Sequence, residues 1–102
     1  MQVIDNLVGG KKQRSASKRN APIFNPATGE QTAELPLSTA AELDAAVAIA
    51  KAAQVAWGDT PPLKRARVMF RFKDLLEQNA DRIARAISAE HGQGMADLFN
   101  AL

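Results

Sequence analysis

The sequence of 102 residues contains no cysteine and only one histidine. Without cysteine, the chain cannot form a disulfide scaffold, a thiol nucleophile or a cysteine-based zinc site. The same absence fits a reducing compartment, so we expect a cytoplasmic location. No apolar run reaches the roughly 18 residues that a membrane-spanning helix needs, and the first residues lack the basic and apolar regions of a secretory signal. We therefore expect a soluble chain without a membrane partner.

Large apolar side chains are scarcer than the composition first suggests. Apolar residues make up 46% of the chain, but 20 of them are alanines. A domain of this length buries a modest share of its surface even when its core is rich in large side chains, and alanine supplies little area. The composition thus indicates a polypeptide that is marginal on its own.

The basic charge of the chain is concentrated near its start. The net charge is +2, with residues 1–20 contributing +4 and residues 21–102 contributing −2. The basic side chains lie within residues 11–19, where no aromatic residue is interleaved with them. We interpret this run as a solvated loop rather than a nucleic-acid-binding segment, and we expect no nucleic-acid partner.

The pattern of elements predicts an α+β fold that is mostly helical. Residues 1–37 are typical of a small β ribbon with loops, residues 38–92 are typical of two or three helices, and residues 93–102 are expected to form an irregular tail. Residues 3–8 form a weak strand, which Gly9-Gly10 ends with a turn.

A second ribbon is predicted around the segment Asn25-Pro26-Ala27-Thr28-Gly29-Glu30. Pro26 fixes φ at an early turn position, and Gly29 can take the left-handed conformation that closes a hairpin. Residues 21–24 and 31–35 are then expected to pair. Because two strands alone are barely stable, this ribbon needs something to pack against.

The first predicted helix begins near Thr39 and ends at Gly58. Thr39 and Glu42 have the spacing of a capping box, with Ser38 as an alternative cap. Residues 40–56 contain nine alanines, the strongest helix former. Residues at helical spacing define one stripe that we expect to be buried: Leu43, Ala46, Val47, Ala50, Ala53 and Trp57.

The second predicted helix begins at Thr60-Pro61, a cap followed by proline, and runs to about Gln78. One apolar sector contains Val68, Met69, Phe72, Leu75 and Leu76. A second apolar patch, Leu63, Ala66 and Phe70, lies roughly 160° from the centre of the first. The polar sector contains Lys64, Arg67, Arg71, Asp74 and Gln78. A helix with two apolar faces requires cover on both sides.

The third predicted helix begins at Asn79 and ends at His91-Gly92, where glycine fits a left-handed stop. Its inward residues are Ala80, Ile83, Ala84 and Ile87. Because neither proline nor glycine interrupts residues 63–91, we also predict that the second and third helices can merge into one.

The residues themselves indicate no active site. His91 is the one imidazole and sits at a helix end, where histidine commonly caps carbonyls, and Glu90 is adjacent in sequence rather than one turn away. Gly92-Gln93-Gly94 starts like a dinucleotide-binding motif, but Asp97 takes the place of the third glycine and a helix precedes it. We assign no catalytic, cofactor-binding or metal-ligating residue.

The order of these features resembles the amino-terminal region of the aldehyde dehydrogenases, from about residue 5 to 97. The matching features are Leu7-Val8-Gly9-Gly10, the Asn25–Glu30 turn, an alanine-rich helix ending near Trp57, the stretch from Arg65 through Leu76, and Glu90-His91-Gly92. The last two are most similar to the CoA-acylating methylmalonate-semialdehyde dehydrogenases. Gln93 departs from this pattern, because that subfamily usually has lysine there.

This resemblance implies a parent enzyme that oxidises an aldehyde through a cysteine thioester, with NAD and CoA as cofactors. The catalytic cysteine and the nucleotide-binding sheet of that family lie beyond the matching region, and no catalytic residue carries over. The resemblance also implies that the backbone of Ile23 and the carboxylate of Glu90 correspond to two ligands of a structural monovalent cation, with no occupied site expected.

Two hypotheses follow for the function of the chain. The leading one is a truncated amino-terminal segment of a methylmalonate-semialdehyde dehydrogenase-like oxidoreductase, inactive alone and completed by the remainder of the parent enzyme. The alternative is an interaction module that forms a homo-oligomer through its apolar helix faces.

Overall fold

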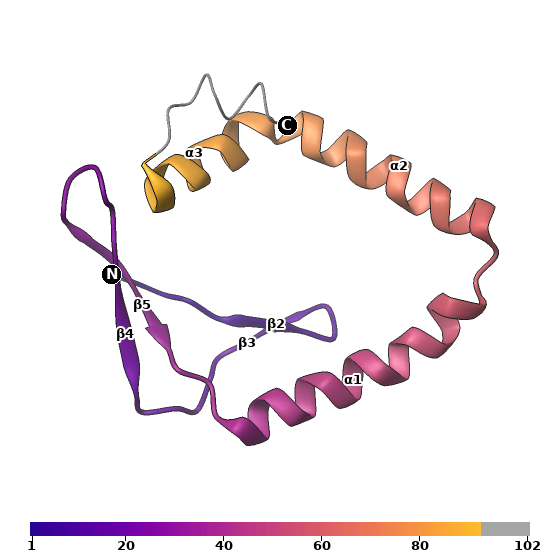
Figure 1. Ribbon diagram of the computed structural model, residues 1–102, viewed down its shortest axis with the longest axis horizontal. Coiled ribbons are helices and arrows are strands. Elements are labelled where there is room, and N and C mark those ends of the chain that lie inside the picture. The colour runs from indigo at the N-terminus through magenta and orange to yellow at the C-terminus, as the bar shows by residue number, and fades with distance from the viewer. Residues whose placement is uncertain (93–102) are drawn as a thin grey trace. The chain divides into compact units, whose positions relative to one another are not determined.

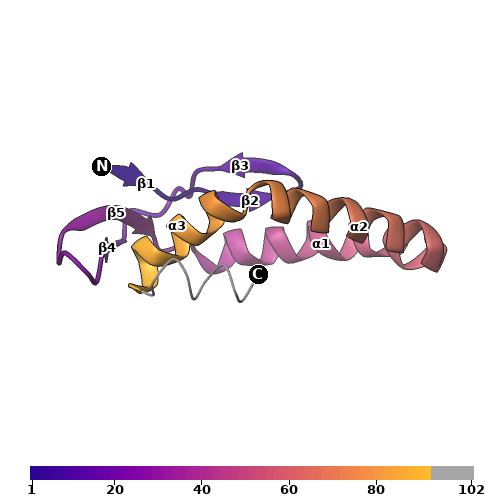
Figure 2. The same ribbon diagram turned by 90° about the horizontal axis from the view of Figure 1, so that it is seen from above.

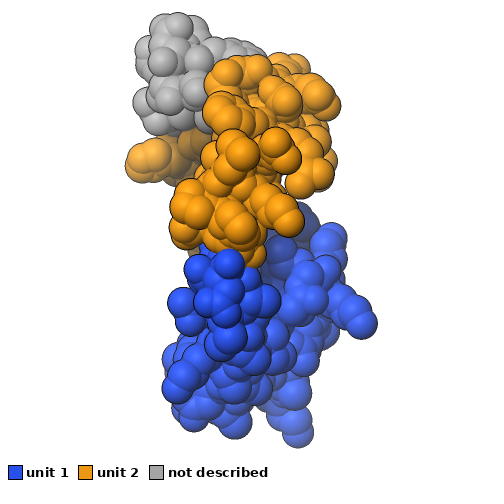
Figure 3. All heavy atoms as spheres, turned by 90° about the vertical axis from the view of Figure 1, so that its right-hand side faces the viewer, with its two compact units in different colours: residues 1–23, 31–59 blue, residues 24–30, 60–102 orange. Residues whose placement is uncertain are grey.

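The computed structural model describes residues 1–92 of the chain. The predicted tail, residues 93–102, lies outside the described residues. The chain divides into two compact units, shown in separate colours in Figure 3. The first unit contains Met1–Ile23 and Gln31–Asp59, and the second contains Phe24–Glu30 and the chain from Thr60 on.

Five short strands form two separate sheets (Figure 1). The first sheet has the order β1-β5-β4, with strands β1 (Gln2–Val3), β4 (Asn20–Phe24) and β5 (Gln31–Pro36). Strand β1 pairs in parallel with β5, so that Gln2 lies opposite Ala33. The predicted pairing of two strands around the 25–30 turn is confirmed.

The second sheet is an antiparallel hairpin of β2 (Asn6–Val8) and β3 (Lys11–Gln13). Gly9 and Gly10 form its two-residue loop, with φ values of 59° and 76°. Positive φ at both positions is the type I′ geometry that matches the twist of paired strands. The predicted Gly9-Gly10 turn is confirmed, but the interpretation of residues 11–19 as a loop is wrong for β3. That strand is exposed throughout, so no apolar alternation marked it in the sequence.

The first helix, α1 (Ala40–Asp59), starts as predicted but continues through Gly58. The amide of Glu42 donates to Thr39 Oγ1 at 3.2 Å, and the amide of Thr39 donates to Glu42 Oε2 at 3.0 Å. These reciprocal bonds confirm the capping box. The prolines at 61 and 62, rather than Gly58, end the helix, since proline lacks an amide and disfavours helical geometry in the residue before it.

Helices α2 (Pro62–Gln78) and α3 (Ala80–His91) stay separate (Figure 1 and Figure 2). The predicted Thr60 cap is wrong, because Pro61 occupies the N-cap position and Pro62 begins α2. The predicted merger is also not seen. Asn79 departs from helical geometry at φ −110° and ψ 14°, and its Nδ2 donates to the Leu75 carbonyl at 2.8 Å. The backbone amide of Asn79 donates to the same carbonyl at 3.0 Å, so the side chain adds a second donor at the end of α2.

The third helix ends as predicted. Gly92 takes the left-handed conformation with φ 76°, and its amide donates to the Ser88 carbonyl at 2.9 Å. Ala84 is fully buried, and Ile83 and Ile87 are half-buried, which confirms the predicted inward face of α3.

Little of the described chain is buried. Ala33, Pro36 and Ala84 are its only buried residues, with Ala33 and Ala84 at 5% and 0% exposure, whereas fifteen large apolar residues are more than a third exposed. The predicted burial of the α1 stripe is therefore wrong for this chain. Val47 is 56% exposed, and α1 has no buried residue, because the short β2–β3 hairpin covers only part of that helix.

Candidate functional site

Glu42 is the most highly connected polar side chain of the first unit. Ser15 Oγ donates to its Oε2 at 2.7 Å, and the amide of Ala16 donates to its Oε1 at 2.7 Å. The capping box adds the amide of Thr39. One carboxylate thus joins the segment after β3 to the first turn of α1, and sequence analysis identified only its capping role.

These hydrogen bonds lower the pKa of Glu42 below its ordinary value of 4.5, with the Ser15 hydroxyl as the largest cause and the amides of Ala16 and Thr39 next. Each donor favours the charged carboxylate. A general base works best with a pKa near the operating pH. Because the pKa of Glu42 is shifted away from neutrality and both oxygens accept bonds, this carboxylate acts as a structural clamp.

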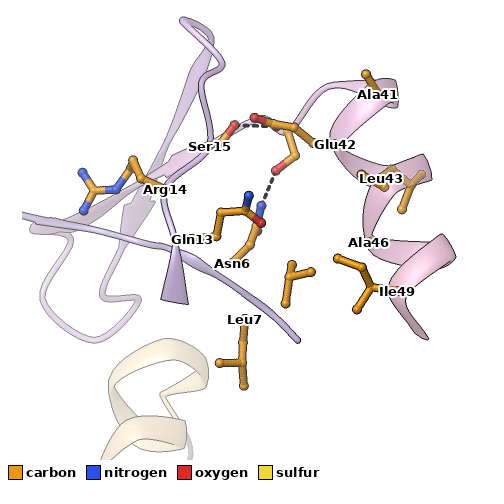
Figure 4. A pocket seen from close by; sticks show the side chains of 13 residues that line it. Asn6, Leu7, Gln13, Arg14, Ser15, Ala41, Glu42, Leu43, Ala46 and Ile49 are labelled. Atoms are coloured by element: carbon orange, nitrogen blue, oxygen red, sulfur yellow. Dashed lines mark hydrogen bonds between the residues drawn. The ribbon is translucent and has the colours of Figure 1, made fainter. Parts of the chain in front are cut away.

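A groove of about 510 Å³ lies beside this clamp, between the β2–β3 hairpin and the first half of α1 (Figure 4). Its floor is apolar and is formed by Leu7, Val8, Leu43, Ala46 and Ile49. Its polar end holds Asn6, whose Nδ2 donates to Ser38 Oγ at 2.8 Å. Since Asn6 bonds Ser38 and Ser15 bonds Glu42, these polar groups are already partnered, and the groove presents mainly apolar surface.

Asp5 and Arg14 form an ion pair that ties the segment after β3 to the segment before β2. The hydrogen bond from the Arg14 guanidinium is the main reason that the pKa of Asp5 is lowered. Both side chains are accessible to water, where such pairs add little stability.

The largest exposed apolar surface of the second unit lies on α2. We call Val68, Met69, Phe72, Leu75 and Leu76 the α2 docking face. Met69 and Phe72 are 55% and 52% exposed, and Leu63 and Phe70 on the other side of the helix are also exposed. The sequence predicted two apolar sectors that need cover, and the described residues leave both largely uncovered.

The side chains that could act in catalysis or bind a metal do not lie in a reactive arrangement in the described part of the chain. His91 is exposed at the end of α3, and no group of three His, Asp or Glu side chains in the described part of the chain could hold a metal ion. Ile23 and Glu90 belong to different units, so their joint role in a cation site stays a prediction.

The described residues also do not form a phosphate cradle for NAD or CoA. The glycines with positive φ are Gly9, Gly10, Gly29 and Gly92. They lie in turns and at the C-terminal end of α3, whereas a dinucleotide pyrophosphate binds at a glycine-rich loop that opens a helix. No step through either cofactor can be derived from these side chains.

The chain is similar to known enzymes over nearly its whole length. Residues 13–101 match the model of the aldehyde dehydrogenase family. The malonate-semialdehyde dehydrogenase of Pseudomonas aeruginosa is 44% identical over 102 residues, which is all of this chain and 20% of that protein.

Two solved structures show the same fold at similar identity. A protein from Sinorhizobium meliloti 1021, assigned as a methylmalonate-semialdehyde dehydrogenase and solved with NAD, matches with a TM-score of 0.93 and 41% identity. The methylmalonate-semialdehyde dehydrogenase of Oceanimonas doudoroffii matches with a TM-score of 0.92 and 45% identity. Each match covers 98% of this chain and 20% of the other. The chain thus spans about a fifth of the length of these relatives, and it belongs to the aldehyde dehydrogenase family.

Proposed function

We propose that the chain is a structural part of a methylmalonate-semialdehyde dehydrogenase-like enzyme and is inactive by itself. The whole enzyme would oxidise a semialdehyde to an acyl-CoA with NAD, and the groups that bind both cofactors would lie outside these residues. In this role the 102 residues supply surface on which the remaining polypeptide packs. A cytoplasmic location is part of the proposal, since the chain lacks cysteine.

The single observation that carries this proposal is the exposed apolar surface. Fifteen large apolar side chains are more than a third exposed, although the described chain has a regular secondary structure. Contiguous apolar surface of this kind usually marks an interface. Relatives that are five times longer supply a natural cover for it, and the lack of cysteine leaves the chain without the thiolate that a thioester needs.

Two proteins test the proposal. The first is the 102-residue chain, for which we expect no NAD-linked aldehyde oxidation above background. The second is a chimera, the P. aeruginosa enzyme with its matching segment replaced by these 102 residues. We expect the chimera to fold and to oxidise malonate semialdehyde at a rate within about tenfold of the parent, because the two segments are 44% identical and cores tolerate apolar substitutions that keep the total volume.

Each measurement can contradict a different part of the proposal. Turnover by the isolated chain would contradict its inactivity. A chimera that is insoluble or inactive would contradict the structural role, because the segment would then not fit the surface that the relative's own segment occupies.

A homo-oligomer is the second candidate, and the charges of two helices favour it. Helix α1 has three carboxylates and one lysine, for a net charge of −2, whereas α2 has five basic and two acidic residues, for +3. Opposite charge around apolar faces would steer α1 of one copy onto α2 of another. Sedimentation of the isolated chain tests this candidate: a dimer weakened by salt supports it, and a monomer contradicts it.

A further inference from the structure

The sector of α2 that carries the docking face also contains one charged residue, Arg65. At 100° per residue, Arg65, Met69, Phe72 and Leu76 fall within a sector about 60° wide, one turn apart along the helix. Arg65 therefore does not lie with the basic residues of the polar sector. Helical spacing alone could have found it, but sequence analysis grouped the basic residues of α2 without it.

The guanidinium of Arg65 has one buried nitrogen that lacks a hydrogen-bond partner among the described residues. Its Nε is buried and has no hydrogen-bond partner among the described residues, and the side chain as a whole is half-buried. The basic residues that form ion pairs in the described chain are Arg14, Lys73 and Arg85, and Arg65 is not among them. Nearly all buried polar groups in proteins find a partner, so an orphaned one calls for an explanation.

The carboxylates of α2 itself do not pair with the Arg65 guanidinium. Glu77 pairs with Lys73 at 3.2 Å. Asp74 lies nine residues after Arg65, which places it about 180° away on the opposite side of the helix. Any carboxylate for Arg65 must therefore come from another element.

Covering the α2 docking face would remove this guanidinium from water. A buried charge without a partner costs several times more free energy than a buried apolar side chain gains. A carboxylate would resolve this, because Arg binds it with two parallel hydrogen bonds in a planar geometry. The net charge of +3 on α2 favours an acidic partner at longer range as well.

We propose that Arg65 is the anchor of an interface in which a segment of the remaining aldehyde dehydrogenase polypeptide covers the α2 docking face and pairs an Asp or Glu carboxylate with this guanidinium. The inference rests on the proposed function. The occupant follows from the relatives, in which a chain with this fold is joined to about four times its own length of further polypeptide. The apolar side chains supply area, and the ion pair sets the register of the docked segment.

The chimera provides the test. Arg65→Met keeps the volume of the side chain and its apolar contacts but removes the charge, and Arg71→Met makes the same change in the polar sector as a matched control. We expect Arg65→Met to lower the apparent Tm of the chimera by about 3 °C or more beyond the control, because a buried carboxylate loses its partner. In the isolated chain, where the described residues offer Nε no partner, we expect no such loss.

A second variant identifies the carboxylate. In the chimera with Arg65→Lys, a carbodiimide should link the amine at position 65 to an Asp or Glu outside the 102 residues, and peptide mass spectrometry would locate both ends. The matched Arg71→Lys chimera should give no such link.

The outcomes separate this inference from the proposed function. An active chimera in which both Met substitutions shift the Tm equally, or in which position 65 forms no external crosslink, overturns the role of Arg65 and leaves the proposed function standing. A chimera that does not fold overturns both.

Discussion

The carboxylate of Glu42 makes the contact between the segment after β3 and α1 sensitive to pH. Its folded-state pKa is lowered, so the stability that it contributes is fully present above its ordinary value of 4.5. That contribution is lost as the pH falls through the lower folded value. Asp5, whose pKa is lowered by Arg14, acts in the same direction.

The amide of Ala16, which donates to Glu42 Oε1, reports this titration. We expect its NMR signal to shift with a midpoint below 4.5 and to stop shifting in Glu42→Gln, which keeps the shape of the side chain and removes its charge. The Asp5→Asn variant serves as the control, since it removes the other carboxyl with a lowered pKa and should leave the Ala16 titration in place. A midpoint at or above 4.5 would show that the hydrogen bonds do not favour the charged form.

Single residues also show where sequence reasoning succeeded. The Thr39–Glu42 capping box, the turn glycines and the Gly92 stop were all predictable, because each depends on bonds or φ values within a few residues. The roles of Ser15 and Ala16 on Glu42 were not predictable, since 26 or 27 residues separate the partners and no local pattern relates them.

At the scale of elements, the break between α2 and α3 depends on Asn79. Its side-chain Nδ2 and its backbone amide both donate to the Leu75 carbonyl, and asparagine is a weaker helix former than alanine. We expect Asn79→Ala to join the two helices, with higher helicity by circular dichroism and slower amide exchange at residues 79–82. Asn79→Gly should keep the break. Unchanged exchange in Asn79→Ala would show that contacts of α3, such as the burial of Ala84, hold the bend instead.

Elements were predictable where one physical signal dominated. Alanine content and capping identified α1, and glycine identified the end of α3. Strand β3 was missed because Lys11-Lys12-Gln13 is polar on both faces. The end of α1 lies beyond the predicted stop at Gly58, because the prolines at 61 and 62 impose a stronger constraint on the backbone than a single glycine does.

At the scale of the whole molecule, the sequence predicted surplus apolar surface but could not say which residues remain exposed. The periodicity of α1 indicates a buried stripe, yet burial depends on a second surface that this chain supplies only in part. Arg65 shows the same limit, because helical spacing places it on the α2 docking face but only the structure shows its unpartnered Nε.

The central claim is that the remaining polypeptide of an aldehyde dehydrogenase covers the α2 docking face. Met69 lies on that face at 55% exposure, and methionine oxidation by peroxide follows exposure. We would compare the oxidation rate of Met69 in the dilute isolated chain with its rate in the active chimera by mass spectrometry, using the exposed Met1 as the reference in the isolated chain. The account predicts rapid oxidation of Met69 in the isolated chain and an oxidation rate at least about tenfold lower in the chimera. Equal rates in the two proteins would contradict it.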